Sequence, residues 1–175
     1  MTLDTRPLRR LMLALASISA PLVAPLFAQT NRDPAAAKLV TEDIARFWQA
    51  FDARTTLGTA AAIDSFYIKP GTAGLKDWLR VRPADAKAFA LVIDKYPAYF
   101  ASARASTLRI AQDEPRIRAA WVKLKALYPD AVFPDVYFLI GRLSTGGTTA
   151  KSGLLIGAEM YGRTTDEALD RKSVV

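Results

Sequence analysis

Apolar positions recur at helical spacing over most of this chain, and strand-like runs appear only near its C-terminal end. The first helix is predicted to begin at Thr41. Ile44, Phe47, Trp48 and Phe51 then fall at i, i+3, i+4 and i+7, which is one face of a helix. Similar patterns predict four further helices, at residues 56–68, from Thr72, at 85–104 and at 113–128.

Two of these helices carry more detailed expectations. Pro97 lies inside residues 85–104, and its ring meets the carbonyl of Ile93 while donating no hydrogen bond, so a kink is expected there. The helix at 113–128 is expected to bury one apolar face, formed by Ile117, Trp121, Leu124 and Tyr128.

The strand-like part comprises residues 132–162. Residues 136–140 and 154–160 are apolar and rich in strand formers, and a small polar loop with Gly146 and Gly147 separates them. We therefore expect one antiparallel β-hairpin made of these two runs. The predicted fold class is α+β, with about five helices followed by this C-terminal hairpin. Two strands alone are marginal in water, so they must pack on the helices or on further chain.

Composition narrows the function classes. The chain has no Cys and no His, which excludes a thiolate nucleophile and removes the commonest general base and the commonest zinc ligand. Its net charge is +7, but the basic residues are scattered, with no run of five. Scattered charge is typical of a solvated surface rather than of a nucleic-acid interface, so no nucleic-acid partner is expected.

The N-terminus has the architecture of a targeting segment. Arg6, Arg9 and Arg10 precede an uncharged apolar run at residues 11–27. We expect a signal peptide at 1–28, export to a bacterial periplasm, a linker at 29–40, a folded domain at 41–162 and a polar tail or truncation at 163–175. The alternative is an uncleaved segment, which would be the protein's one contact with a membrane.

Several motifs occur in an order that resembles one bacterial family. They are Tyr67-x-x-Pro70-Gly71-x-x-Gly74-Leu75, Lys95-Tyr96-Pro97-x-Tyr99, Tyr137-Phe138-Leu139-Ile140-Gly141 and Gly153-Leu154-Leu155-Ile156-Gly157-Ala158-Glu159-Met160. This order resembles the N-terminal half of a family of predicted zinc-dependent proteases, uncharacterised and distantly similar to the gliding-motility lipoproteins. The resemblance spans about residues 41–162 and is most specific in the hairpin. It implies an incomplete zincin-like domain, because in that family the hairpin precedes a helix with H-E-x-x-H, whose two His hold zinc.

The family's activity does not transfer to this chain, because a chain without His cannot supply those ligands. We predict no catalytic residue and no metal ligand here, and zinc only in an intact family member. The expected function is that of an exported, truncated member of the peptidase family, with the gene continuing beyond residues 163–175 into the H-E-x-x-H helix. The alternative is a self-sufficient periplasmic binding module that uses the edge of the hairpin.

The same resemblance implies a partner, since in zincin-like folds an extended peptide pairs with a sheet edge above the metal helix. The candidate edge is small and polar enough to admit another backbone, and it comprises Ser144, Thr145, Gly146, Gly147 and Thr148. Glu159 is a candidate substrate-facing carboxylate on the second strand. The alternative for Glu159 is an exposed position near a strand end or a pair with Lys or Arg.

Overall fold

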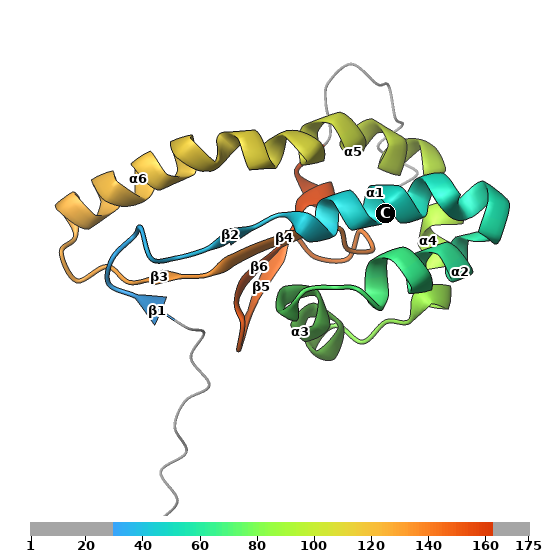
Figure 1. Ribbon diagram of the computed structural model, residues 1–175, viewed down its shortest axis with the longest axis horizontal. Coiled ribbons are helices and arrows are strands. Elements are labelled where there is room, and N and C mark those ends of the chain that lie inside the picture. Colours follow the sequence, from blue (N-terminus) through green and yellow to red (C-terminus); the bar gives the residue numbers. More distant parts are fainter. Residues whose placement is uncertain (1–29, 163–175) are drawn as a thin grey trace, which may run out of the picture.

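The computed structural model describes residues 30–162 (Figure 1), so the predicted signal peptide at 1–28 and tail at 163–175 lie outside the described residues. The α+β fold class is confirmed, because the described part is mostly helical with a small sheet. The helices are α1 (Glu42–Leu57), α2 (Thr59–Ile63), α3 (Ala73–Val81), α4 (Ala86–Lys95), α5 (Pro97–Arg109) and α6 (Glu114–Leu127). The strands are β1 (Thr30–Asn31), β2 (Leu39–Val40), β3 (Phe133–Pro134), β4 (Val136–Leu139), β5 (Gly147–Ala150) and β6 (Gly153–Gly157).

Helix α1 forms as its apolar pattern predicts. Ile44, Phe47, Trp48 and Phe51 are all buried, and Glu42 and Asp43 occupy the first turn, where they complement the helix dipole. This helix lies at the centre of the molecule (Figure 1). After α2 the chain continues into a π-helical turn, Asp64–Ile68, which buries Tyr67 against Phe47 and Phe89. The aromatic side chains of these elements form the main core.

Pro97 breaks the predicted helix at 85–104 instead of kinking it. Helix α4 ends at Lys95, and α5 begins with Pro97 in its first turn. A proline is tolerated at that position because the first amide groups of a helix have no intrahelical acceptor. Asp85 caps α4 by accepting a hydrogen bond from the backbone N–H of Ala88 (2.8 Å).

The four-stranded sheet has the order β2-β4-β6-β5, which differs from the expected strand pairing. Strands β4 and β6 pair in parallel, so the prediction that residues 136–140 pair antiparallel with 154–160 is wrong. A C-terminal antiparallel hairpin is nevertheless present, formed by β5 and β6. The apolar runs occupy interior strands, whereas the polar residues read as loop supply the outer strand β5; interior parallel strands are typically the apolar ones.

The segment predicted as a linker contributes two strands to the fold. Strand β1 pairs antiparallel with β3, and β2 pairs in parallel with β4. Asp135 is buried between these elements, and its side chain accepts a hydrogen bond from the backbone N–H of Lys38 (2.9 Å). Residues 30–40 therefore belong to the folded unit.

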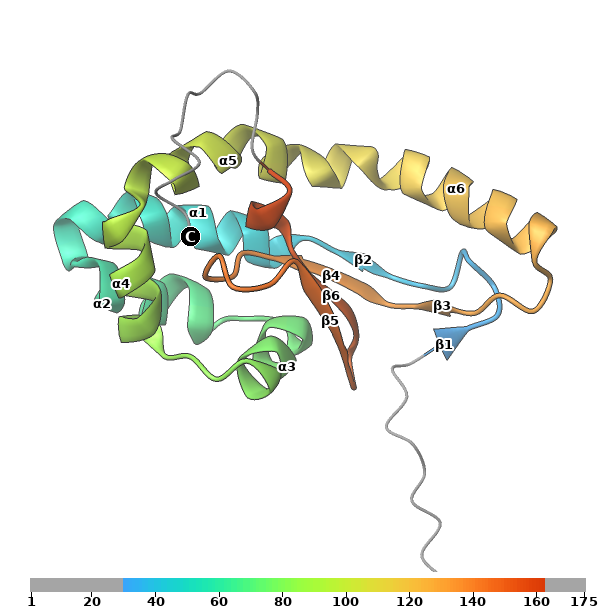
Figure 2. The ribbon, with the colours of Figure 1, turned by 180° about the vertical axis from the view of Figure 1, so that it is seen from behind.

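Helices lie on both faces of the sheet. Helix α3 lies on one face, where Gly74 contacts the ring of Tyr137 closely enough that a side chain at residue 74 would collide with it. Helices α5 and α6 lie on the opposite side, as both views show (Figures 1 and 2). Beyond α5, α6 extends alongside β2 and β3.

The prediction that α6 buries an apolar face is wrong. Leu124 is 47% exposed and Tyr128 59%, and Trp121 is only half-buried, in a small cluster with Phe133 and two alanines. No residue of α6 is fully buried. The reason is positional: most of α6 projects past the main core, and within residues 30–162 its half-buried Trp121 packs only on the small cluster of Ala37, Ala131 and Phe133.

Candidate functional site

Strand β5 forms one edge of the sheet, and its hydrogen-bonding pattern can be followed residue by residue. The backbone N–H of Gly157 donates to the carbonyl of Gly146 (3.1 Å), so these two residues form a hydrogen-bonded pair of the β5–β6 ladder. Hydrogen-bonded and non-hydrogen-bonded pairs alternate in an antiparallel ladder. Thr148 therefore turns its backbone groups to β6, whereas Gly147 and Thr149 direct their N–H and C=O groups away from the sheet. Both residues are exposed, so these groups form an open edge.

The predicted edge residues occupy three different environments. Ser144, Thr145 and Gly146 lie in the loop that carries the chain from β4 past the end of β6. Gly147 lies on the open edge, and Thr148 is half-buried in the hairpin. Sequence reasoning missed that residues 147–150 form a strand, in which the outward backbone groups of Thr149 complete the edge. The run of residues 147–150 contains two threonines, which favour strands, and that composition was the available signal.

The loop before β5 is held by close contacts. The hydroxyl of Thr145 donates to the carbonyl of Gly147 (3.2 Å), so one outward carbonyl of the edge already has an intramolecular donor. The hydroxyl end of the exposed Tyr161 side chain also lies close to Gly146, so a side chain at residue 146 would displace it. The edge therefore begins at a defined point in the chain.

Glu159 is buried rather than exposed, and it faces the loop instead of the edge. Its carboxylate accepts hydrogen bonds from the backbone N–H groups of Gly141 (2.8 Å) and Leu143 (3.3 Å). Among the residues that the structure describes, no Lys or Arg pairs with it. Burial raises the pKa of Glu159 to about 7, against the lowering effect of the backbone N–H donors.

The position of Glu159 at this loop matters because Leu143 has a strained backbone. Its φ is 55°, in the left-handed region that residues with a side chain rarely adopt. The hydrogen bond from its N–H to Glu159 helps to hold this conformation. Glu159 therefore shapes the segment that leads from β4 to β5, and it does not contact the open edge.

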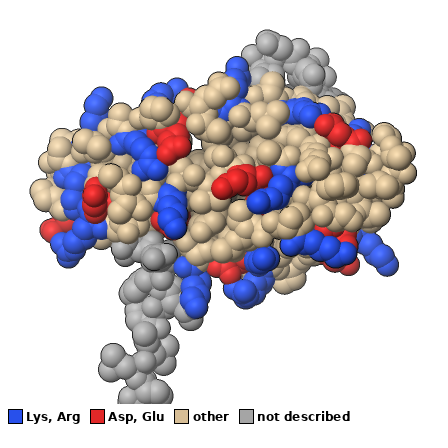
Figure 3. Space-filling view, in the orientation of Figure 1, with Lys and Arg blue, Asp and Glu red and all other residues tan. Residues whose placement is uncertain are grey.

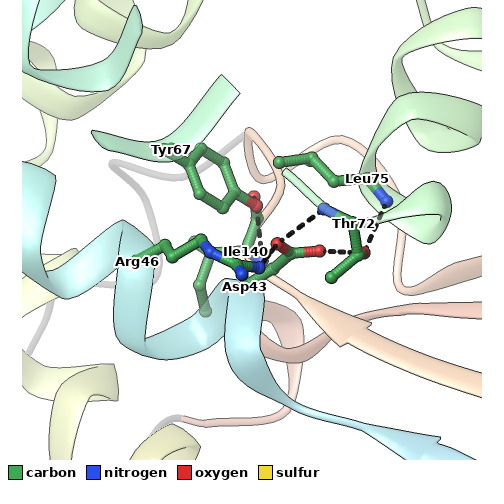
Figure 4. Close-up of polar contacts among 6 residues, drawn as sticks. All are labelled: Asp43, Arg46, Tyr67, Thr72, Leu75 and Ile140. Carbon is green, nitrogen blue, oxygen red and sulfur yellow. Dashed lines mark hydrogen bonds and ion pairs between the residues drawn. The ribbon is translucent and has the colours of Figure 1, made fainter. Parts of the chain in front are cut away.

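A polar cluster around Asp43 fixes α3 against α1 (Figure 4). The Asp43 carboxylate accepts hydrogen bonds from Arg46 (2.9 Å) and from both the backbone N–H (3.1 Å) and the hydroxyl of Thr72. Thr72 in turn caps α3 by accepting from the N–H of Leu75 (3.3 Å). Every member thus has a structural partner, and the cluster positions α3 beneath the sheet.

Asp77 of α3 anchors the turn of the hairpin. Its carboxylate accepts from the backbone N–H of Ser152 (2.8 Å) and from Arg80. Burial alone would raise the pKa of Asp77, but the bonds from Ser152 and the Arg80 charge outweigh it, so the pKa is lowered. This contact holds the β5–β6 turn on α3.

A groove of about 330 Å³ lies on the opposite face of the sheet, beneath α5 and α6. Phe138 and Ile156 form its floor, and Ile110 and Ile117 form part of its wall. Asp113 and Arg116 lie at the groove as a loose ion pair of 3.7 Å. Its lining is mainly apolar, so it can take an apolar group.

The outward N–H and C=O groups of β5 can form hydrogen bonds with another extended backbone. Residues 30–162 contain no group of three or more His, Cys, Asp or Glu side chains placed to hold a metal ion. None of the helices in that range is long and apolar enough to cross a membrane. On the face shown in Figure 3, basic side chains are spread out, with acidic ones among them.

Comparisons with known proteins assign no relative. No family model, no curated protein and no solved structure matches this chain.

Proposed function

We propose that this protein binds an extended peptide along the open edge of β5, and that it supplies the peptide-binding part of a zinc-peptidase-type domain without catalysing cleavage itself. The observation that carries the proposal is the outward direction of the backbone groups of Gly147 and Thr149. A peptide that adds a strand to a sheet needs free donors and acceptors at its edge. Of the outward groups of these two residues, only the carbonyl of Gly147 already has a donor within residues 30–162, the hydroxyl of Thr145.

The edge also lacks the usual protection against strand addition. Natural edge strands are commonly blocked by proline, by charged side chains or by a covering element. Residues 147–150 include no proline and no charge, and both outward-facing residues are exposed. Each added hydrogen bond contributes roughly 1 kcal/mol net, so a short peptide is expected to bind weakly, in roughly the high-micromolar to millimolar range.

The resemblance to predicted zinc-dependent proteases supports the same assignment, because it implies a sheet edge that receives substrate. The proposal is consistent with export, because a peptide-binding protein in the periplasm would meet extended peptide segments. The resemblance supports the kinship with peptidases, and the N-terminal pattern at residues 1–28 supports the periplasmic location.

The decisive variant is Thr149→Pro, tested in the full chain. Proline removes the outward N–H of residue 149, and prolines are accepted on an edge strand when that N–H faces solvent. A fluorescein-labelled, extended pentapeptide (Glu-Thr-Leu-Thr-Glu, blocked at both ends) should bind about fivefold more weakly to this variant, as measured by fluorescence anisotropy, because one hydrogen bond is lost. Thr149→Ala is the matched control, because it changes the side chain but keeps the N–H.

The melting temperature of each variant shows whether the fold survives. Thr148→Pro serves as a second control, since residue 148 donates within the hairpin and its loss should destabilise the sheet. Equal peptide binding by Thr149→Pro, Thr149→Ala and the parent chain would contradict the proposal.

A self-sufficient binding module is the second candidate, and one observation favours it. The main core is closed within residues 30–162: Phe47, Tyr67, Phe89 and Leu155 have no exposed surface. Such a core can support a stable fold without further chain. A cooperative, monomeric unfolding transition without dye binding would favour this candidate over the peptidase-type half.

A further inference from the structure

A gap in the side chains of β5 lies beside one apolar residue of β6. Gly147 is paired with Ile156, and Thr149 with Leu154. Paired residues of an antiparallel ladder share one face of the sheet, so all four lie on the face opposite α3. On that face Thr149 contributes a side chain next to Leu154, whereas Gly147 contributes none next to Ile156.

The gap is adjacent to an apolar surface that a ligand can reach. A Cβ placed on Gly147 would lie 3.5 Å from Cδ1 of Ile156, so that methyl group is directly across the empty position. Ile156 is only half-buried, and it also forms part of the floor of the apolar groove with Phe138. The half-exposed isoleucine is the apolar surface nearest to the edge at this point.

A peptide strand added to β5 would place alternate side chains on this same face. Neighbouring strands lie about 4.8 Å apart, and side chains of one strand alternate between faces. The peptide residue beside Gly147 could lay a large apolar side chain across the glycine and onto Ile156. The residue two positions away would face Thr149, whose side chain covers the equivalent approach to Leu154.

Charge adds a second preference. The segment from residue 141 to residue 157 carries two charged residues, Arg142 and Lys151, and both are basic. Acidic residues that flank the apolar one would therefore be attracted to the edge, in a salt-dependent manner.

We infer that the ligand of this edge is an extended acidic peptide with a large apolar residue, such as leucine, that packs across Gly147 onto Ile156. This inference rests on the proposed function, because it specifies which peptides the same edge prefers.

The test compares peptides on the full chain by fluorescence anisotropy. The labelled Glu-Thr-Leu-Thr-Glu peptide should bind about tenfold more tightly than its counterpart with central glycine, because partial burial of a leucine side chain is worth roughly that factor. A counterpart with lysine in place of both glutamates should bind several-fold more weakly at low salt, and that difference should shrink in 0.5 M salt. A third peptide carries N-methyl groups on alternate amides, which removes the donors needed for edge pairing.

Two protein variants locate the preference. In Ile156→Ala the leucine-to-glycine ratio should fall to about twofold or less. Leu154→Ala is the matched control, since residue 154 lies on the same strand and face but beside Thr149, and the ratio there should stay unchanged.

The possible results distinguish the preference for leucine from edge pairing itself. Equal affinity for the leucine and glycine peptides, together with loss of binding on N-methylation, would overturn this inference and leave edge pairing intact. Equal loss of the ratio in Ile156→Ala and Leu154→Ala would also overturn it. Binding that N-methylation does not weaken would contradict the proposed function itself.

Discussion

Glu159 shows how one residue links stability to pH in this protein. Its pKa in the folded state, about 7, lies above the ordinary value of 4.5 because the side chain is buried. The folded state therefore holds this proton more tightly than the unfolded state does. The stabilising contribution is complete below about pH 4.5, and it is lost as the pH rises through 7.

The predicted consequence is a fold that weakens between pH 5 and pH 8. The difference in unfolding free energy attributable to Glu159 is on the order of 3 kcal/mol. Urea unfolding at the two pH values measures it. Glu159→Gln cannot titrate, so its stability should change much less over the same interval. Asp77 makes no contribution in this window, since its lowered pKa places its titration well below pH 5.

At the scale of single elements, the hydroxyl of Tyr67 joins the π-helical turn Asp64–Ile68 to the end of β4. It donates to the carbonyl of Ile140 (2.5 Å) and accepts from the N–H of the same residue (3.0 Å), and all these atoms are buried. If the hydroxyl were removed, no water would replace it as the partner of the buried carbonyl and N–H of Ile140.

Tyr67→Phe should therefore lower the free energy of unfolding by about 2–4 kcal/mol, because two buried backbone groups lose their partner. Chemical denaturation measures the change. Tyr128→Phe is the matched control, since Tyr128 is 59% exposed, and it should stay within about 0.5 kcal/mol of the parent. A Tyr67→Phe variant as stable as the parent would show that the bond contributes nothing net.

The elements also show what the sequence can and cannot predict. Helix α1 follows from its own apolar spacing, because a helix is determined by neighbours three and four residues apart. The partner of β4 does not follow from local pattern, since residues 136–140 and 154–160 suit either a hairpin or a parallel pair. Only the placement of β5 outside β6 decides between them, and the polar composition of residues 147–150 hides that strand.

The same limit applies to the candidate site. The sequence identifies the small polar segment that includes Gly147, but it does not show which backbone groups face outward. That depends on which residues of β5 form hydrogen-bonded pairs with β6. For Glu159 the sequence offered a substrate-facing or an exposed role. Its burial against the N–H groups of Gly141 and Leu143 depends on a loop conformation that no local pattern announces.

At the scale of the whole molecule, α6 and its C-terminal loop carry an apolar surface that nothing within residues 30–162 covers. Leu127 is 85% exposed, and Val122, Leu124, Tyr128 and Val132 are exposed with it. The apolar groove beneath α5 and α6 lies near the start of the same helix. Exposed apolar surface of this extent is typical of an interaction site.

We expect the full chain to bind a hydrophobic dye and to self-associate at high concentration. The double substitution Leu124→Lys with Leu127→Lys should reduce both effects, as followed by dye fluorescence and sedimentation velocity. The control is Leu57→Lys with Leu91→Lys, which changes two leucines that are also exposed (51% and 74%) but lie on α1 and α4. Equal reduction by both pairs would mean that α6 has no special part in association.

The chain as a whole is also predicted to bind no stoichiometric zinc and to cleave no peptide. A catalytic zinc site uses three protein ligands, usually with at least one His, and the sequence contains neither His nor Cys. Elemental analysis after dialysis against zinc, together with a quenched-fluorescence peptide assay, tests this. Tight equimolar zinc would contradict the prediction.

The central claim, that β5 receives a peptide strand, is tested most directly by amide hydrogen exchange of the full chain, followed by NMR. In the free protein the N–H groups of Gly147 and Thr149 should exchange rapidly, and that of Thr148 slowly, because only Thr148 donates to β6. A saturating amount of the Glu-Thr-Leu-Thr-Glu peptide should slow exchange at Gly147 and Thr149, with little change at Thr148. Peptide binding that leaves exchange at both outward amides unchanged would contradict the account.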